Sequence, residues 1–202
     1  GSPNLEGKVV PHPPPGSSTL RSTPDTSSEP MTDATTTSAS GSTASTVHTV
    51  TAKTDEAMRA LGRELASLAG PGDLLILSGP LGAGKTTLTR GLGEGLGVRG
   101  AVTSPTFVIS RIHPSVVGGP ALVHVDAYRL GGADEVDDID LDTTLADSVT
   151  VVEWGEGVAE DLSDERLEIS IERHSDDTRT VHLRAVGARW AHSELPGSAG
   201  RG

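Results

Sequence analysis

Cysteine is absent from this chain of 202 residues, which also has few aromatic residues and no long apolar runs. The lack of cysteine excludes disulfide bonds and thiolate metal sites, and it fits a reducing compartment such as the cytoplasm. Without a long apolar run the sequence offers neither a signal-peptide core nor a membrane span. We therefore expect a cytoplasmic protein that has no membrane partner.

Positive charge is also in short supply. The chain has 16 lysines and arginines against 28 aspartates and glutamates, so its formal net charge at pH 7 is −12. A protein that binds nucleic acid by itself normally carries a basic face that neutralises phosphates. We therefore expect no DNA partner, and any link to RNA has to run through a partner protein.

Composition divides the chain into three parts. Residues 1–46 are rich in Ser, Thr and Pro and show no apolar periodicity, so this segment cannot bury enough surface to offset the entropy of ordering it. We predict a disordered tail over 1–46, one folded domain over 47–186 and a flexible C-terminal tail over 187–202.

Apolar periodicity predicts two helices and six strands. The first helix begins at the N-cap Thr54 and stops at the GPGD sequence of residues 70–73. The second follows a glycine-rich turn and places Leu88, Leu92 and Leu96 on one stripe. The expected strands cover 47–52, 74–78, 121–126, 148–153, 166–172 and 180–184. Strand–helix alternation followed by a hairpin predicts an α/β fold, with a mixed, mostly parallel sheet, flanking helices and a C-terminal antiparallel hairpin.

The stretch GPLGAGKT (residues 79–86) matches the P-loop pattern G-x-x-x-x-G-K-[ST] between an expected strand and an expected helix, which is the context that such a loop requires. Its glycines let backbone N–H groups point at phosphate oxygens, and the helix N-terminus adds partial positive charge. Lys85 then reaches the β and γ phosphates, and the Thr86 hydroxyl binds Mg²⁺. The motif predicts a P-loop NTPase.

Two carboxylates stand where such an enzyme needs them. Asp126 and Glu153 each end an apolar run, and the carboxyl ends of parallel strands meet at the edge of the sheet where ligands bind. A P-loop enzyme needs one carboxylate beside its Mg²⁺ and one group that orients the attacking water. For each acid the alternative is a solvated residue at a strand end.

The order of GAGKTT, TSPTF, DAYRL and EW, followed by the C-terminal hairpin, resembles the TsaE family, also called YjeE. The resemblance runs from Thr49 to Leu183. It implies a single P-loop domain that uses ATP and Mg²⁺ in the bacterial pathway that makes threonylcarbamoyladenosine in tRNA. It also implies a TsaB–TsaD partner complex in which TsaD carries the transferase chemistry, so tRNA is reached only through the partner.

The resemblance implies roles for the matching residues. Lys85 and Asp126 take catalytic roles, Asp126 in hydrolysis, and Glu153 joins Thr86 at the Mg²⁺. The implied nucleotide-binding residues are Thr54, Asp55, Gly79, Gly82, Ala83, Gly84, Lys85, Thr86, Thr87 and Trp154. The implied switch loop at the γ-phosphate consists of Thr103, Ser104, Pro105, Thr106 and Phe107.

Two positions depart from the family pattern. Pro80 replaces a residue that is often acidic and is not a phosphate ligand, so this change has little effect. Gly155 replaces the proline that usually follows the tryptophan, and we expect it to loosen the loop after Trp154.

Three of the four aromatic residues lie beside polar groups: Phe107, Tyr128 and Trp154. Trp154 follows the expected metal-binding acid at a strand end, so it should lie near the nucleotide and report on it. We assign Tyr128, with its neighbour Arg129, to a partner surface, and we expect slow ATP hydrolysis until a partner completes the site. The alternative is that all three are ordinary core residues. The fourth, Trp190, falls in the predicted C-terminal tail.

Missing motifs exclude other P-loop classes. Asn4 is the only asparagine, so the N-K-x-D guanine motif of a GTPase is absent, and the chain has no LSGGQ-like signature of a transporter ATPase. Two alternatives stay open. One is a small-molecule P-loop kinase, which needs an acceptor pocket, and the other is a binding module in which ATP only sets a conformation.

Two further features resemble metal sites without meeting their requirements. The acidic segment 134–142 would need glycine and glutamate where Thr143 and Val149 stand if it were an EF-hand loop. We interpret it as a solvated acidic helix or a partner surface. His124 lies inside an apolar run, and we interpret it as a packed strand residue.

Overall fold

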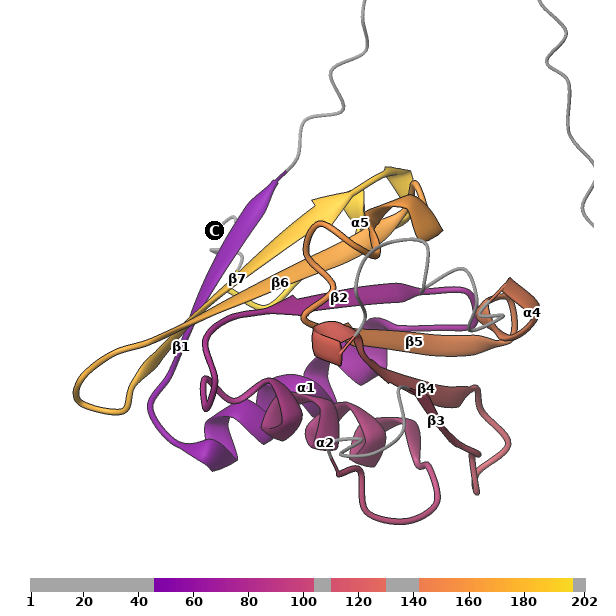
Figure 1. The fold of residues 1–202 in the computed structure, drawn as a ribbon, viewed down its shortest axis with the longest axis horizontal. Helices are drawn as coiled ribbons and strands as arrows, with labels where there is room; N and C mark the ends of the chain where they lie inside the picture. The colour runs from indigo at the N-terminus through magenta and orange to yellow at the C-terminus, as the bar shows by residue number, and fades with distance from the viewer. Residues whose placement is uncertain (1–45, 104–109, 130–141, 198–202) are drawn as a thin grey trace, which may run out of the picture. The chain divides into compact units, whose positions relative to one another are not determined.

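The computed structural model describes residues 46–103, 110–129 and 142–197, which form a seven-stranded sheet with helices packed on it (Figure 1). The strands are β1 (Val47–Ala52), β2 (Leu74–Ser78), β3 (Ser110–His113), β4 (Ala121–Asp126), β5 (Ser148–Glu153), β6 (Arg166–Arg173) and β7 (Arg179–Val186). The α-helices are α1 (Asp55–Leu68), α2 (Lys85–Leu96), α4 (Asp142–Leu145) and α5 (Ala188–Ala191), and the 3-10 helices are η1 (Ala127–Arg129) and η2 (Glu160–Leu162).

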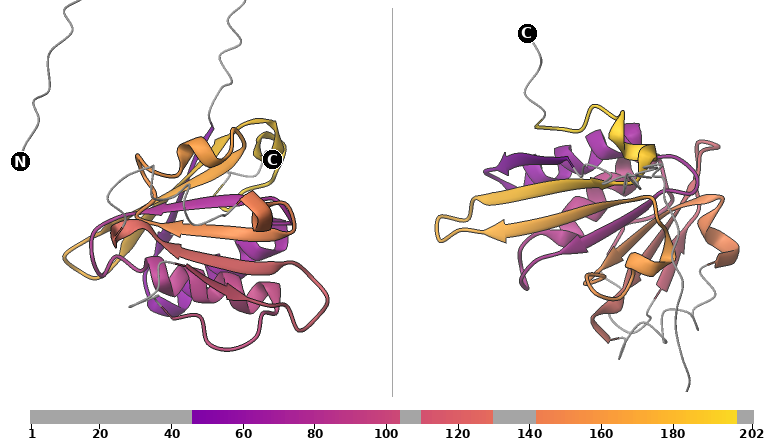
Figure 2. Two further views of the ribbon diagram at one scale, coloured as in Figure 1. Left: turned by 45° about the vertical axis from the view of Figure 1, so that its right-hand side comes forward. Right: turned by 90° about the horizontal axis from the view of Figure 1, so that it is seen from above.

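The centre of the sheet is parallel and both of its edges are antiparallel. The strand order is β1-β7-β6-β2-β5-β4-β3, in which β6, β2, β5 and β4 pair in parallel and the remaining pairs are antiparallel. This arrangement confirms the predicted mixed α/β sheet and its C-terminal hairpin, formed by β6 and β7, whose turn projects beyond the neighbouring strands (Figure 2). The short edge strand β3 was not predicted, because its sequence SRIH has no apolar alternation.

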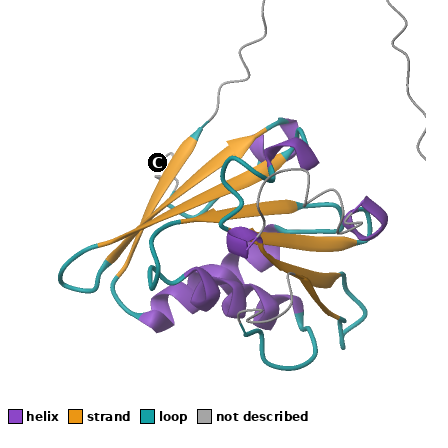
Figure 3. Cartoon of the chain, in the orientation of Figure 1, coloured by secondary structure: helices purple, strands orange, loops and turns teal. Residues whose placement is uncertain are grey.

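Helices α1 and α2 lie together on one side of the strands (Figure 3). α1 begins where the sequence predicts, because the Thr54 hydroxyl accepts a hydrogen bond from the Ala57 N–H at 3.0 Å. The two helices approach so closely that a Cβ at Gly91 would come within 2.1 Å of the Arg59 carbonyl oxygen. This contact between helices compensates for the helix-weakening effect of glycine in α2. Among the described helices, none has the length and apolar composition to cross a membrane.

The predicted C-terminal tail is wrong for residues 187–197. This segment forms α5 and packs on the domain, where Trp190 and Leu195 are each 1% exposed within the main core cluster. The side chain of Arg189 anchors the segment by donating to the Leu68 carbonyl oxygen and to the Asp73 carboxylate, both at 2.8 Å. The segment is too short to show periodicity in the sequence, and Leu68 and Asp73, which anchor Arg189, lie more than a hundred residues away. Residues 198–202 and the predicted tail up to residue 45 lie outside the described residues.

Candidate nucleotide site

The P-loop, residues 79–86, joins the end of β2 to the start of α2. Gly79, Gly82 and Gly84 have φ angles of 142°, 76° and 106°, a region that side chains disfavour. At Gly79 there is also no space for a side chain, since a Cβ would come within 2.6 Å of the Ile171 carbonyl oxygen. The glycines thus permit the curled backbone whose N–H groups can surround a phosphate, at the N-terminus of a 12-residue helix.

Lys85 is folded back onto this loop. Its side chain is buried, and its Nζ donates to the carbonyl oxygens of Gly79 and Pro80 at 2.8 and 2.9 Å. Burial lowers the pKa of the Lys85 ammonium, while the charges of Glu153 and Asp126 oppose that shift. The ammonium therefore rests against two backbone carbonyls at the P-loop and within the electrostatic influence of two carboxylates, from where it can reach a bound phosphate.

The two predicted acids meet at the P-loop edge. β5 pairs in parallel with both β4 and β2, and this register places Asp126 and Leu77 beside Glu153. Glu153 is 3% exposed, and its Oε1 accepts a hydrogen bond from the Thr86 hydroxyl at 3.1 Å. The predicted edge placement is confirmed. His124 is also brought to this carboxylate, with its Nε2 at 2.9 Å from Oε1 of Glu153, a contact that the sequence analysis missed.

These donors fit Mg²⁺. A carboxylate and a hydroxyl are the oxygen ligands that Mg²⁺ takes from proteins, and this ion usually completes its shell with water and substrate phosphates. Among the described residues there is no group of three or more His, Asp or Glu side chains that could hold a metal ion. Glu153 and Thr86 would hold the ion.

Two aromatic side chains lie together beside Lys85. The ring of Trp154 lies 3.9 Å from Lys85 Nζ, in cation–π geometry, and its centroid is 5.1 Å from that of Tyr128. Tyr128 is 71% exposed, and its N–H donates to Asp126 Oδ1 at 3.0 Å. The core alternative is therefore wrong for Tyr128, and Trp154 is only half-buried. The one described aromatic that does anchor the core is Trp190.

Two arginines of the C-terminal hairpin border the P-loop, and the sequence analysis missed both. Arg179 is 9% exposed, ion-pairs with Asp55 at 2.9 Å, and would lie 3.6 Å from a Cβ at Gly84. Arg173 donates to the carbonyl oxygen of Gly82 at 3.4 Å. The contact with Asp55 brings the start of α1, with the predicted residues Thr54 and Asp55, close to the P-loop. No linear pattern signals these contacts, because the hairpin is separated from the P-loop by about ninety residues.

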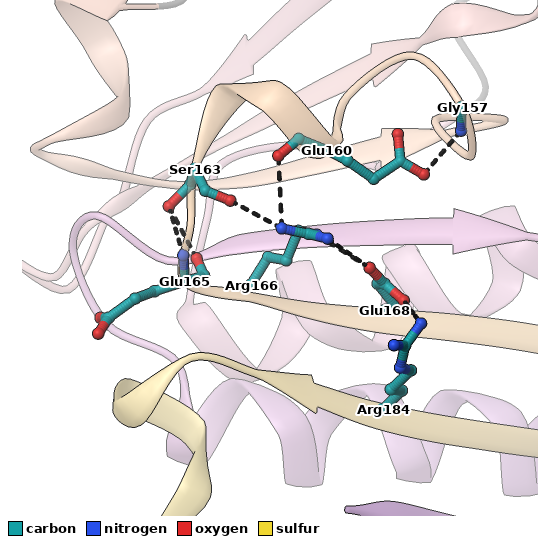
Figure 4. Close-up of polar contacts among 7 residues, drawn as sticks. All are labelled: Gly157, Glu160, Ser163, Glu165, Arg166, Glu168 and Arg184. Carbon is teal, nitrogen blue, oxygen red and sulfur yellow. Dashed lines mark hydrogen bonds and ion pairs between the residues drawn. The ribbon is translucent and has the colours of Figure 1, made fainter. Parts of the chain in front are cut away.

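A hollow of about 450 Å³ lies on the sheet face opposite α1 and α2, beside η2. Arg166 is one of its lining residues and donates from Nη1 to the Ser163 carbonyl oxygen at 3.1 Å and from Nε to Glu168 at 2.9 Å (Figure 4). Glu168 also accepts from Arg184 at 3.1 Å. Among the charged residues that line this hollow, Arg166 and Arg184 both pair with Glu168, and its walls do not include Lys85 or the two acids.

Comparisons with known proteins identify the family. A sequence model described as threonylcarbamoyl adenosine biosynthesis protein TsaE matches residues 52–181. The chain belongs to the TsaE family. It is 62% identical over 148 residues to the tRNA threonylcarbamoyladenosine biosynthesis protein TsaE of Streptomyces coelicolor, covering 71% of this chain and 100% of that protein. The TsaE of Mycobacterium tuberculosis is 53% identical over 125 residues, covering 57% of this chain and 74% of the relative.

The TsaE fold is also seen in a solved structure. The crystal structure of YdiB from Bacillus subtilis is 36% identical, has a TM-score of 0.59, and matches 72% of this chain and 90% of its own.

Gly155, a departure from the family pattern, does not loosen the loop as expected. It is buried, and its carbonyl oxygen accepts from the N–H groups of Val158 and Ala159 at 3.0 and 2.8 Å, which closes a tight turn after Trp154.

Parts of the predicted site lie outside the described residues. In the switch loop only Thr103 is described; its hydroxyl accepts from Arg111 at 3.3 Å, and residues 104–107 are not described. The same holds for the Arg129 side chain and for most of the acidic segment, residues 134–141. Thr87 is half-buried in the first turn of α2, and Ala83 is fully buried.

The contact between Lys85 and Trp154 makes the tryptophan a reporter. A bound phosphate draws the Lys85 ammonium away from the ring, so we expect ATP to change the emission of Trp154. A Trp190→Phe background leaves Trp154 as the only tryptophan and keeps an aromatic ring at the buried position. A fluorescence titration measures the change, and a Trp154→Phe variant in that background is the blank. If calorimetry shows saturation with ATP while Trp154 emission stays constant, the ring does not sense the nucleotide.

Proposed function

We propose that this TsaE-family protein is an accessory ATPase of the threonylcarbamoyladenosine modification of tRNA, hydrolysing Mg-ATP to drive or reset a TsaB–TsaD complex. The observation that carries the proposal is the meeting of Thr86 and Glu153 at 3.1 Å beside the Lys85 ammonium, at the N-terminus of α2. This is the arrangement by which P-loop enzymes hold a triphosphate and its metal ion.

Each residue has a distinct task in the proposed reaction. The P-loop N–H groups bind the β and γ phosphates, and Lys85 leaves the carbonyl oxygens of Gly79 and Pro80 to neutralise the transferring phosphoryl group. When bound, Mg²⁺ supplies charge neutralisation between the two phosphates. Asp126, held at the same edge, orients the attacking water and accepts its proton.

A partner is expected because the site is open on one side. Leu81 in the P-loop is 88% exposed and Tyr128 is 71% exposed, so apolar and aromatic surface flanks the Lys85 region. Burying such surface against a second protein is energetically favourable. We assign this role to TsaB–TsaD, and tRNA is reached only through that complex since the chain has a net charge of −12.

The kinase alternative finds less support. A kinase needs an acceptor pocket facing the γ-phosphate, whereas the hollow of about 450 Å³ lies on the other sheet face, where Glu168 pairs with Arg166 and Arg184.

Single-turnover product analysis with γ-labelled ATP tests the proposal. We expect inorganic phosphate as the labelled product, released slowly by the chain alone and faster after a TsaB–TsaD complex is added. Tyr128→Ala should reduce the acceleration and leave slow turnover in place, because its exposed ring belongs to the surface that a partner covers. Label found on an added metabolite would establish a kinase. Binding of ATP without turnover, with or without the complex, would instead establish a nucleotide-gated binding module.

A further inference from the structure

Among the described residues, His124 lies beside the proposed metal site and is accounted for by neither the motif nor the resemblance. It lies on β4 two residues before Asp126, and it is fully buried. Its Nε2 is 2.9 Å from Oε1 of Glu153, while no hydrogen-bond partner of its Nδ1 exists among the described residues. A packed strand residue would not need this contact, so the contact itself requires an explanation.

The direction of the hydrogen bond follows from chemistry. An ionised carboxylate can only accept hydrogen bonds. Nε2 of His124 therefore carries the ring N–H and donates a hydrogen bond to Oε1 of Glu153. The Thr86 hydroxyl approaches the same carboxylate from α2, at 3.1 Å from Oε1 and 3.3 Å from Oε2. Glu153 is therefore held from two directions, from the neighbouring strand and from the helix that follows the P-loop.

We propose that His124 is a positioning residue for Mg²⁺ binding, which holds the Glu153 carboxylate in its metal-binding orientation through the bond from Nε2 to Oε1. The inference rests on the proposed function, since it assigns His124 a task at that site. A glutamate has three rotatable side-chain bonds, and losing one fixed partner lets the carboxylate turn away from Thr86. His124 itself cannot drift, because its backbone is locked between β3 and β5.

The effect should be specific to the metal. Residues that hydrogen-bond a metal-binding group typically change metal affinity about 10- to 100-fold when they are removed. A histidine that served burial alone would instead affect stability and leave the Mg²⁺ dependence of nucleotide binding unchanged. The two explanations therefore differ in a measurement that does not depend on ATP turnover.

The test compares ADP binding by calorimetry with and without Mg²⁺ in three variants of the full chain. His124→Leu removes the donor, His124→Gln can place an amide N–H near the Nε2 position, and His124→Asn is too short to reach it. We expect His124→Leu and His124→Asn to lose about 10- to 100-fold of the Mg²⁺-dependent affinity. Binding without Mg²⁺ should stay close to that of the native protein, and His124→Gln should recover most of the loss.

His113→Leu is the matched control. His113 is also a buried histidine on the same sheet face, since it pairs with Leu122, and its Nε2 has no hydrogen-bond partner among the described residues. Its replacement should leave the Mg²⁺ dependence unchanged, and thermal unfolding checks that each variant is folded.

Two results would overturn the inference: native Mg²⁺ dependence in folded His124→Leu, or, should that variant not fold, equal Mg²⁺ dependence in His124→Gln and His124→Asn. If the native protein itself bound ADP without any Mg²⁺ dependence, the proposed function would fail first. That outcome is visible before any variant is compared, so the two failures are distinguishable.

Discussion

Lys85→Ala is expected to remove at least about 100-fold of the ATP turnover while the protein stays folded, since loss of one preorganised stabilising group costs about that much. The ammonium is the positive side chain at the P-loop that can reach the transferring phosphoryl group. Its hydrogen bonds go to the carbonyl oxygens of Gly79 and Pro80, which belong to the P-loop. The fold therefore does not depend on the Lys85 ammonium. A phosphate-release assay at saturating Mg-ATP measures the loss.

Lys53→Ala is the matched control, since Lys53 is exposed between β1 and α1. It should keep native turnover.

Thr86→Ala should lose turnover as Lys85→Ala does. It should also weaken Mg²⁺-dependent nucleotide binding, because the Thr86 hydroxyl that it removes faces Glu153. Native rates in a folded Lys85→Ala protein would contradict the assignment of the catalytic site.

The second large effect separates the two acids. Asp126→Asn should bind Mg-ATP normally and lose about 10²- to 10⁴-fold of the turnover, the range that a general base contributes. Glu153→Gln should instead weaken Mg²⁺-dependent nucleotide binding, because it removes the charge from the carboxylate that meets Thr86. The structure supports this division: Glu153 is buried against Thr86, whereas Asp126 is more open and accepts only from the Tyr128 N–H among its described hydrogen bonds.

Binding and turnover have to be measured on the same preparations, by calorimetry and by phosphate release. Glu156→Gln is the control for a lost carboxylate, since Glu156 is exposed three residues after Glu153 and lines the hollow on the other sheet face. If Asp126→Asn lost Mg²⁺-dependent binding and Glu153→Gln retained it, the roles of the two acids would be exchanged. The Gln and Asn replacements keep size and shape, so a difference reports charge.

Contacts between residues that are close in the sequence were predictable. Thr54 caps α1 three residues before its hydrogen-bond partner, and the P-loop from residue 79 to 86 is one contiguous turn. The ends of the parallel strands were predictable as well, because a strand buried on both faces has to finish in a polar group at the sheet edge. From those local rules the positions of Asp126 and Glu153 could be derived before the structure was known.

The sequence by itself determined the two long helices α1 and α2, most strands, the P-loop and the two acids, because capping, periodicity and glycine φ angles act over a few residues. Only the tertiary structure decided which distant residues meet. Strand order and register bring His124 to Glu153, and the return of β6 and β7 to β2 and β1 brings Arg179 to the P-loop. The burial of Trp190 likewise needs a surface assembled from distant elements. Such contacts depend on how the strands pair, and no local pattern encodes that pairing.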